Sequence, residues 1–465
     1  MPAITGSTNL YANTSQAVVK NWYDYGGVFT INLCNTSSTA ATVSIAVSSS
    51  QSAPQTSEWL VWNRTILPYN VVELLGICVG VNQYVVVQSS SASVVSQAWG
   101  FVASETASST NDIVTQTQGA QAFTGFNSPA LMNNSNVGAP QYAVVSTPAG
   151  GFVSVGWSST ATPAYATSTN GATWTTPAAV NGTSTAGILT AIARNSAGSL
   201  YVAVGSDNQT TNPIFATSTN GATWTTPAAV TGSAFSCRFQ GVAVNSSGLW
   251  VAVGSGNSNG YPIYSTSANG STWSTPALMN GVSATAYMGA IAVNSSGLFV
   301  AVGSNASNHP MFATSTNGST WTTPARMNGS TSQSPMAAVA VNSSGLFVAV
   351  GNSGGFNNYP VYATSTDGST WSTPATMAGY TAGPIFMSNI AVNSNGIFVA
   401  SGYDYNTGYM YYSSSTNGST WSTPSLFNNN TTGYVPNGIA VNGAGLFVVV
   451  GSLAAGGYPL YATSK

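Results

Sequence analysis

The chain has 465 residues, of which only 3% are charged, and its formal net charge is −2. Binding nucleic acid requires many Lys and Arg side chains to neutralise phosphates, and the chain has only six, so we expect no nucleic-acid partner. No apolar run is as long as a membrane span, so we expect no membrane insertion either.

The first hundred residues carry the pattern of short β-strands. The segments in which apolar and polar side chains alternate, or that complete the set, are residues 28–35, 41–47, 58–62, 83–88 and 93–102. Strands of this length between turn residues are typical of an antiparallel β-sandwich, which we predict over residues 1–102. Residues 103–122, rich in Ser, Thr and Gln, are predicted to form a linker.

Residues 123–465 repeat one unit seven times. A Phe-Val-Ala-Val-Gly type segment occurs in every copy, and a Gly-x-Thr-Trp type segment occurs in six. The tryptophans that end these segments are spaced 48 to 50 residues apart and are Trp174, Trp224, Trp273, Trp321, Trp371 and Trp421. A fixed period of this length indicates a repeat architecture.

Each unit is expected to form four short strands. In the copy that ends in Trp321 they are residues 290–294, 298–302, 310–315 and 320–324. Asn317 and Gly318 join the last two strands, and this pair favours a two-residue type I′ hairpin turn, in which both residues have positive φ. The second strand hardly alternates, which is expected when both faces of a sheet are covered.

Seven four-stranded units predict a seven-bladed β-propeller. The last unit ends after its third strand, so its fourth strand must come from residues 126–132, where Phe126 takes the place of the repeat tryptophan. This exchange closes the ring and pairs an edge that would otherwise be open. An open solenoid is the alternative, but it would need capping repeats. The predicted fold class is therefore all-β: an antiparallel β-sandwich, then a propeller over residues 123–465 that is closed by an N-terminal outer strand.

Part of the N-terminal pattern resembles a known module. The segments at residues 32–47, 58–60 and 70–77 are similar to a small module of tailed-phage virion proteins, notably from phages of marine and cyanobacterial hosts. The resemblance covers most of residues 5–102. It implies an attachment or assembly domain that contacts other virion proteins and carries no catalytic residue.

The repeats resemble bacterial and phage propellers with Phe-Val-Ala-Val-Gly and Ser-Thr-Asp-Gly-x-x-Trp units, and they are similar to the Asp-box of sialidases, Ser-x-Asp-x-Gly-x-Thr-Trp. In the first copy Thr169 stands where the Asp belongs, whereas the other positions of the box are matched by Thr167, Gly171, Thr173 and Trp174. Only Asp367 supplies a carboxylate in any of these turns, one place late. The box stabilises a turn in that family, so the resemblance implies a fold and transfers no activity.

Charged residues on the predicted propeller are too few for a glycosidase. Residues 123–465 contain no Glu, whereas a sialidase-like site needs a Tyr–Glu nucleophile pair. Other glycosidases need two carboxylates about 5–10 Å apart, and Asp207 and Asp404 fall in blades that are not adjacent. We therefore expect no enzyme, no catalytic residue and no cofactor. We also expect no metal: the lone His309 is predicted to be a solvated loop residue, and a calcium ion at Asp207 is the alternative.

The two faces of the predicted propeller differ in their turns. Turns after the first and third strands are nearly uniform, whereas loops after the second and fourth strands differ in every blade and carry aromatic residues. Uniform turns opposite variable loops indicate a scaffold with one working face. Because Tyr and Trp beside Asn, Ser and Thr can stack on sugar rings, we expect a glycan-binding face, although each aromatic residue could instead pack its own loop. The candidate residues are Trp157, Tyr261, Tyr287, Tyr359, Tyr380, Tyr403, Tyr405, Tyr409 and Tyr434.

These observations predict a non-enzymatic virion protein of a tailed phage, placed on a tail fibre, the tail or a head appendage. We expect the N-terminal domain to contact other virion proteins and the propeller to bind host surface polysaccharide, as a homo-oligomer that gains from avidity. The start shows no secretory signal, so we expect synthesis in the host cytoplasm and exposure on the released particle, unless the chain is a processed form. The alternatives are a purely structural capsid or tail decoration protein and a glycan-cleaving enzyme.

Overall fold

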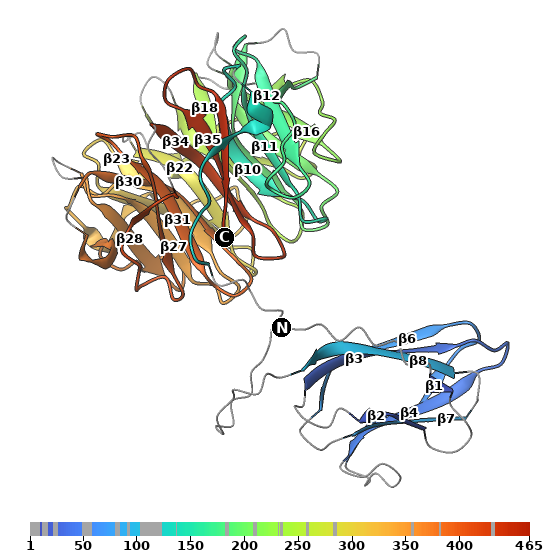
Figure 1. The fold of residues 1–465 in the computed structure, drawn as a ribbon. Coiled ribbons are helices and arrows are strands. Elements are labelled where there is room, and N and C mark those ends of the chain that lie inside the picture. The colour runs from blue at the N-terminus through green and yellow to red at the C-terminus, as the bar shows by residue number, and fades with distance from the viewer. Residues whose placement is uncertain are drawn as a thin grey trace. The chain divides into compact units, whose positions relative to one another are not determined.

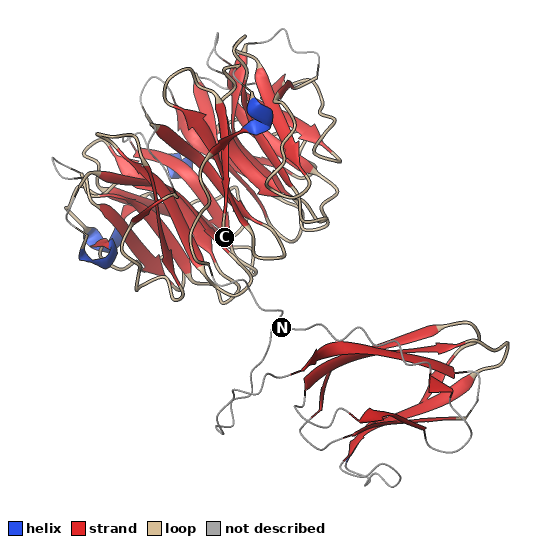
Figure 2. Cartoon of the chain, viewed as in Figure 1, coloured by secondary structure: helices blue, strands red, loops and turns tan. Residues whose placement is uncertain are grey.

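The computed structural model separates into two compact units, Met1–Thr115 and Gln116–Lys465 (Figure 1). The described residues are 10–11, 17–21, 27–48, 58–79, 84–90, 94–102 and 123–465, the last range without 136, 182–185, 208–211, 231, 233–235, 257–259, 282–285, 355–357, 381–382 and 429–432. The predicted linker, residues 103–122, lies outside them. The regular structure is strands and short 3-10 turns (Figure 2), and no helix in the described part is long and apolar enough to cross a membrane.

The N-terminal unit contains two four-stranded antiparallel sheets (Figure 1). Its strands are β1 (Leu10–Tyr11), β2 (Ala17–Asn21), β3 (Gly27–Asn35), β4 (Ala41–Ser48), β5 (Trp59–Ile66), β6 (Val71–Val79), β7 (Tyr84–Ser89) and β8 (Val94–Val102). The strand orders are β1-β8-β3-β6 and β2-β7-β4-β5. Leu33 of one sheet and Val43 and Ile45 of the other are buried, so both sheets contribute apolar side chains to the interior. The predicted β-sandwich is confirmed.

The second unit contains seven four-stranded antiparallel sheets, or blades, numbered here by chain order. The first strands of the blades are β10 (Gln141–Ser146), β14 (Gly187–Arg194), β18 (Cys237–Val244), β22 (Ala286–Val293), β26 (Met336–Val341), β30 (Ile385–Val392) and β34 (Tyr434–Val441). The second strands are β11 (Phe152–Trp157), β15 (Tyr201–Asp207), β19 (Trp250–Gly256), β23 (Phe299–Asn305), β27 (Phe347–Asn352), β31 (Phe398–Asp404) and β35 (Phe447–Leu453). First strands of successive blades contact one another and therefore lie innermost.

The outer half of each blade is built from the third and fourth strands. The third strands are β12 (Pro163–Ser168), β16 (Pro213–Ser218), β20 (Pro262–Ser267), β24 (Pro310–Ser315), β28 (Pro360–Ser365), β32 (Met410–Ser415) and β36 (Pro459–Thr463). The fourth strands are β13 (Ala178–Ala179), β17 (Ala228–Ala229), β21 (Ala277–Leu278), β25 (Ala325–Arg326), β29 (Ala375–Thr376), β33 (Ser425–Leu426) and β9 (Ala130–Leu131). Four of them lead into 3-10 turns, η2 (Met132–Asn134), η3 (Met279–Gly281), η4 (Met327–Gly329) and η5 (Met377–Gly379).

The ring is closed by the start of the second unit, as predicted. Strand β9 completes blade 7 by pairing with β36, with Leu131 opposite Leu460. Phe126 forms an isolated bridge with Ser464, as Trp174 does with Ser168 in blade 1. The predicted seven-bladed propeller and its exchanged strand are confirmed.

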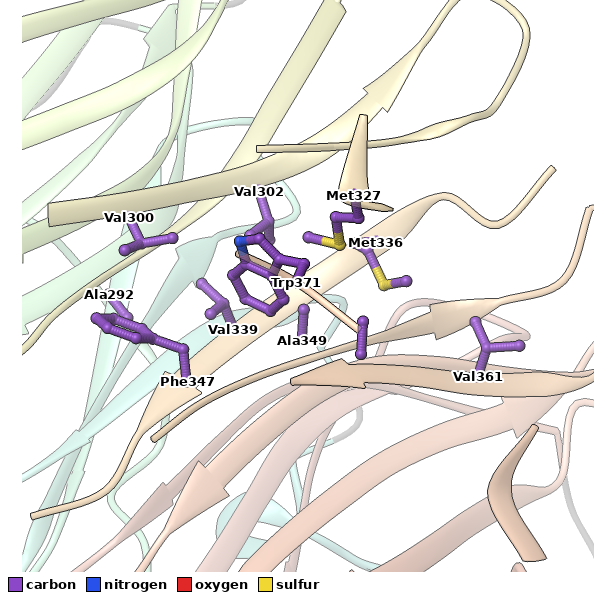
Figure 3. Packing of buried hydrophobic residues seen from close by; sticks show 11 residues of the cluster. Ala292, Val300, Val302, Met327, Met336, Val339, Phe347, Ala349, Val361 and Trp371 are labelled. Atoms are coloured by element: carbon purple, nitrogen blue, oxygen red, sulfur yellow. The ribbon is translucent and has the colours of Figure 1, made fainter. Parts of the chain in front are cut away.

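Tryptophan and alternating second-strand residues build the core between blades. In blade 5, Trp371 and Phe347 pack with Val300 and Val302 of the preceding blade (Figure 3). The next residue of the same strand, Val348, is fully buried in the cluster shared with blade 6. Both faces of each second strand are therefore covered, which explains why these strands read as continuous apolar runs.

Two expectations about the last hairpin of the blade were wrong. Of the pair Asn317 and Gly318, only the glycine has positive φ (71°), so the two residues do not form a type I′ turn. Instead the Asn317 side-chain oxygen accepts the backbone N–H groups of Ser319 and Thr320 at 2.9 and 2.7 Å. The fourth strand is β25, after the predicted residues 320–324, because the turn and the buried Trp321 occupy that segment.

Candidate functional site: the central cavity

Every first strand of the propeller contains a β-bulge at the same position. In β22 the register with β23 slips between Met288 and Ala290, so Gly289 has no partner. The glycine of the Phe-Val-Ala-Val-Gly segment accommodates this slip, because a Cβ at Gly303 would meet the carbonyl oxygen of Tyr287. The seven bulged residues are Tyr142, Thr190, Gln240, Gly289, Ala337, Ser388 and Asn437.

The bulged residues surround one cavity at the centre of the ring. All seven line a space of about 500 Å³, whose other walls come mainly from the first strands. The bulge is followed by small residues, such as Ala143 and Ala290, and then by aliphatic ones, such as Ile192 and Ile291. Five of the seven bulged residues are polar, and Asn389, which follows the bulge of blade 6, is polar as well. The lining residues include no Asp, Glu, Lys, Arg or His.

Three bulged side chains also bind the neighbouring blade. Each donates a hydrogen bond to the backbone carbonyl oxygen of the residue before the next blade's bulge. The pairs are Thr190 Oγ1 with Phe239 at 2.8 Å, Ser388 Oγ with Pro436 at 3.0 Å, and Asn437 Nδ2 with Gln141 at 3.0 Å. Gln240 differs, because its side-chain oxygen is buried and has no hydrogen-bond partner among the described residues. A buried acceptor of this kind needs water or a ligand.

Aromatic residues line the cavity toward the end where the first strands begin. The ring of Tyr287 lies beside Gly289, where a Cβ would overlap it. The rings of Phe386 and Tyr403 meet edge to face, with centroids 6.0 Å apart. Burial raises the pKa of Tyr287, although nearby Arg238 opposes the shift, and burial also raises the pKa of Tyr403. Both hydroxyls are therefore neutral at neutral pH and can donate or accept hydrogen bonds.

The nine predicted face residues do not form one site. Tyr287 and Tyr403 line the cavity. Trp157, the last residue of β11, occupies the position that Tyr403 has in blade 6. Burial raises the pKa of the cavity residue Tyr142, and the nearby Trp157 opposes this shift in part. These three residues share the inner end of the variable face.

The other six predicted residues do not line the cavity and are Tyr261, Tyr359, Tyr380, Tyr405, Tyr409 and Tyr434. Tyr261, Tyr359 and Tyr409 are half-buried, and each immediately precedes the third strand of its blade. The same position is occupied by His309 in blade 4 and by Tyr458 in blade 7. Tyr380 and Tyr434 pack against buried core clusters. Tyr405 is 73% exposed. Packing against the core is thus shown for Tyr380 and Tyr434.

The carboxylates of the propeller hold turns. The Asp404 side chain accepts the backbone N–H groups of Asn406 and Thr407, and Asp207 accepts that of Asn212 at 3.2 Å. No group of three potential metal ligands of the His, Cys, Asp or Glu type occurs in the described part of the chain.

Asp367 takes the role of Asn317 in the equivalent turn of blade 5. Its Oδ1 atom accepts the backbone N–H groups of Ser369 and Thr370, and the bond from Thr370 is the largest cause of the lowering of its pKa to about 2. The acceptor one place after the Asp-box position therefore supports the turn in both blades.

Sequence reasoning missed the bulge layer, although the repeats contain its signal. In six copies the bulged residue is followed by Gly, Ala or Asn, then by Ile or Val, and then by Ala. The bulged residue itself is different in each copy, whereas these three following positions hardly change. Aligning the copies and asking which strand position varies would have found the cavity residues. Searching the loops for aromatic residues identified only Tyr287 and Tyr403 among the residues that line the cavity.

Comparison with known proteins supports the fold. No family model matches the chain, and no curated protein is similar in sequence. The BP39L lectin from Burkholderia pseudomallei is similar in structure with a TM-score of 0.54 and 12% identity, over 70% of this chain and 96% of the lectin.

Two further solved structures are less similar. A leech intramolecular trans-sialidase matches with a TM-score of 0.41 and 10% identity, over 100% of this chain and 99% of the enzyme. A protein of unknown function from Dyadobacter fermentans matches with a TM-score of 0.44 and 13% identity, over 73% of this chain and 97% of its own. At these scores neither supports an argument about this chain, whose architecture is established by its own strand pairing as a seven-bladed β-propeller.

Proposed function

We propose that the propeller binds an uncharged glycan in the central cavity and does not cleave it. The observation that carries this proposal is the lining of the space of about 500 Å³: amide, hydroxyl and aromatic side chains lie among small and aliphatic residues, and no charged side chain is present. Sugar hydroxyls need paired donors and acceptors, which Gln240 and Asn437 offer, and their apolar ring faces need aromatic contact, which Tyr287 and Tyr403 offer.

Binding without turnover is favoured by the same lining. Hydrolysis of a glycosidic bond requires a carboxylic acid and a second carboxylate on either side of the bond. Asp207 and Asp404 are engaged in loop turns and do not line the cavity. The structural likeness to a Burkholderia lectin is in keeping with a binding role.

We further propose that this is a virion protein whose N-terminal sandwich attaches it to the particle and whose propeller recognises host surface polysaccharide. The support is the N-terminal resemblance to a tailed-phage module, together with the charge-poor surface. A purely structural decoration protein would keep the same fold and lack ligand binding.

The full chain should be titrated with a panel of neutral oligosaccharides, and the same mixtures assayed for released reducing sugar. We expect saturable binding and no release. Ala337→Trp, which fills the cavity from the bulge layer, should abolish binding, whereas Tyr405→Ala on the exposed loop should not. Product release would overturn the non-enzymatic proposal, and undiminished binding by Ala337→Trp would overturn the cavity as the site.

A further inference from the structure

A second group of polar and aromatic residues lies in blade 6, outside the central cavity. It surrounds Asp404, the last residue of β31, and includes Tyr380, Tyr409 and Tyr411. The rings of Tyr380 and Tyr411 pack against the buried core of blade 6, which fixes their positions. The carbonyl oxygen of Tyr409 accepts the backbone N–H of Asp404 at 2.9 Å, so the hairpin holds both residues together. We name these four residues the Asp404 site.

The two carboxylate oxygens of Asp404 are used unequally. Oδ1 accepts the backbone N–H groups of Asn406 and Thr407 at 2.8 and 2.9 Å. Oδ2 receives no hydrogen bond from the described residues, and none of their cationic side chains pairs with it. In blade 4 the equivalent Asn305 holds its own loop with a single amide oxygen, accepting the N–H of Ser307 at 3.0 Å. The loop therefore does not require the second oxygen or its charge.

The free oxygen borders the same small space as the Tyr380 hydroxyl. A Cβ placed on Gly383 would lie 3.7 Å from Asp404 Oδ2 and 3.7 Å from the Tyr380 hydroxyl, so both atoms border the same space. Burial raises the pKa of Tyr411 most, and the neighbouring Tyr380, Asp404 and Tyr409 raise it further. No described residue forms a hydrogen bond with the three hydroxyls.

We propose that the Asp404 site binds the protonated amino group of an amino sugar. An ammonium group carries three donors, which match a carboxylate oxygen and neighbouring hydroxyls. A neutral sugar would leave the negative charge of the Asp404 carboxylate without an opposite charge. A quaternary ammonium group has no N–H to donate to the tyrosine hydroxyls. The aromatic rings supply the surface that a sugar ring needs. This site is separate from the central cavity, so the inference goes beyond the proposed function and does not depend on it.

The matched pair of variants is Asp404→Asn and Asp207→Asn in the full chain. Asn305 shows that an amide supports this loop position, so both variants should fold, which thermal denaturation verifies. Surface plasmon resonance would compare a glucosamine oligosaccharide with its N-acetylated counterpart. We expect the free-amine oligosaccharide to bind about tenfold more tightly or better, and Asp404→Asn to remove that preference. Asp207→Asn, in a blade without such tyrosines, should keep it.

Three further measurements separate this site from its rivals. Ala337→Trp should leave binding of the free-amine oligosaccharide unchanged, because that substitution fills only the central cavity. Tyr411→Phe keeps the packed ring and removes one acceptor, so it should weaken binding severalfold even if Asp404→Asn unfolds. A lysine-containing peptide should bind more weakly than the amino sugar.

Equal affinity for the two oligosaccharides, or an Asp404→Asn variant with wild-type preference, would overturn the proposal. Preference for the lysine peptide would move the assignment from an amino sugar to a protein side chain.

Discussion

The two ends of each first strand follow different rules. At one end of six first strands an Asn turn leads into the second strand, and its geometry repeats: the Asn294 side-chain oxygen accepts the N–H of Leu298 at 2.9 Å, and Asn342 does the same for Leu346 at 2.9 Å. Blade 1 has Thr147 at this place, whose hydroxyl accepts the N–H of Gly151 at 2.9 Å. Toward the other end lies the bulged residue, which is different in all seven blades. Because the repeated turns and tryptophans fix the blade, the bulge layer is free to vary, and with it the chemistry of the cavity.

The largest loss of stability is expected for substitution of repeated tryptophans that are buried between the blades. Trp371→Ala should lower the free energy of unfolding by about 3–5 kcal/mol, because it leaves a cavity between blades 4 and 5. Guanidinium denaturation would measure the loss, with Tyr405→Ala as the exposed control. Trp321→Ala should cost a similar amount, and a much smaller value in either blade would contradict the idea of equivalent, constant cores.

The next largest loss of stability is expected for Asn317, whose side-chain oxygen accepts hydrogen bonds in the turn. Asn317→Ala removes the oxygen that accepts two backbone N–H groups and should cost about 1–2 kcal/mol. Asn317→Asp should cost little, because Asp367 performs the same task in blade 5. Equal losses in the two variants, measured by denaturant titration, would show that the side-chain oxygen is not what supports the turn.

Within the variable layer, smaller losses are expected. Thr190→Val keeps the shape of the side chain but removes its hydrogen bond to Phe239, which should cost about 0.5–1.5 kcal/mol. Thermal denaturation would measure it, and Ala337→Ser, which adds a hydroxyl at a bulge without one, serves as the control. A loss larger than that of Asn317→Ala would erase the contrast between the constant and variable regions.

The smallest effect concerns pH. The pKa of Asp367 is lowered from 3.8 to about 2, so its contribution to stability is complete above pH 3.8 and is lost as the pH falls through about 2. Because the side chain is exposed, we expect only a slightly flatter Tm profile over this window in Asp367→Asn. Identical profiles for wild type and variant would mean that the charge contributes nothing measurable.

The repeat period predicted the blade number, the third strands and the exchanged closing strand, because these follow from local apolar runs and from counting copies. The predicted third strand, residues 310–315, coincides with β24 (Pro310–Ser315). The Asn-Gly turn was mispredicted because the pair itself favours a tight hairpin, while the Asn317 side chain stabilises a wider one. The bulge escaped prediction because one extra residue disturbs a period-two pattern that the small residues already weaken. Tyr380 and Tyr409 were among the predicted face residues, but Tyr411 and the unequal use of the Asp404 oxygens were not predicted, because they depend on how the folded loops bring these groups together.

The exchanged strand also has a consequence for biosynthesis. Asn127 and Thr463, which hydrogen-bond at 3.0 Å beside the closing strand, are 336 residues apart. The ribosome therefore releases six blades before the seventh can be assembled from both ends of the repeat region. During that interval β9 has no partner and the nascent ring presents an open edge, so ring closure is a late event in folding.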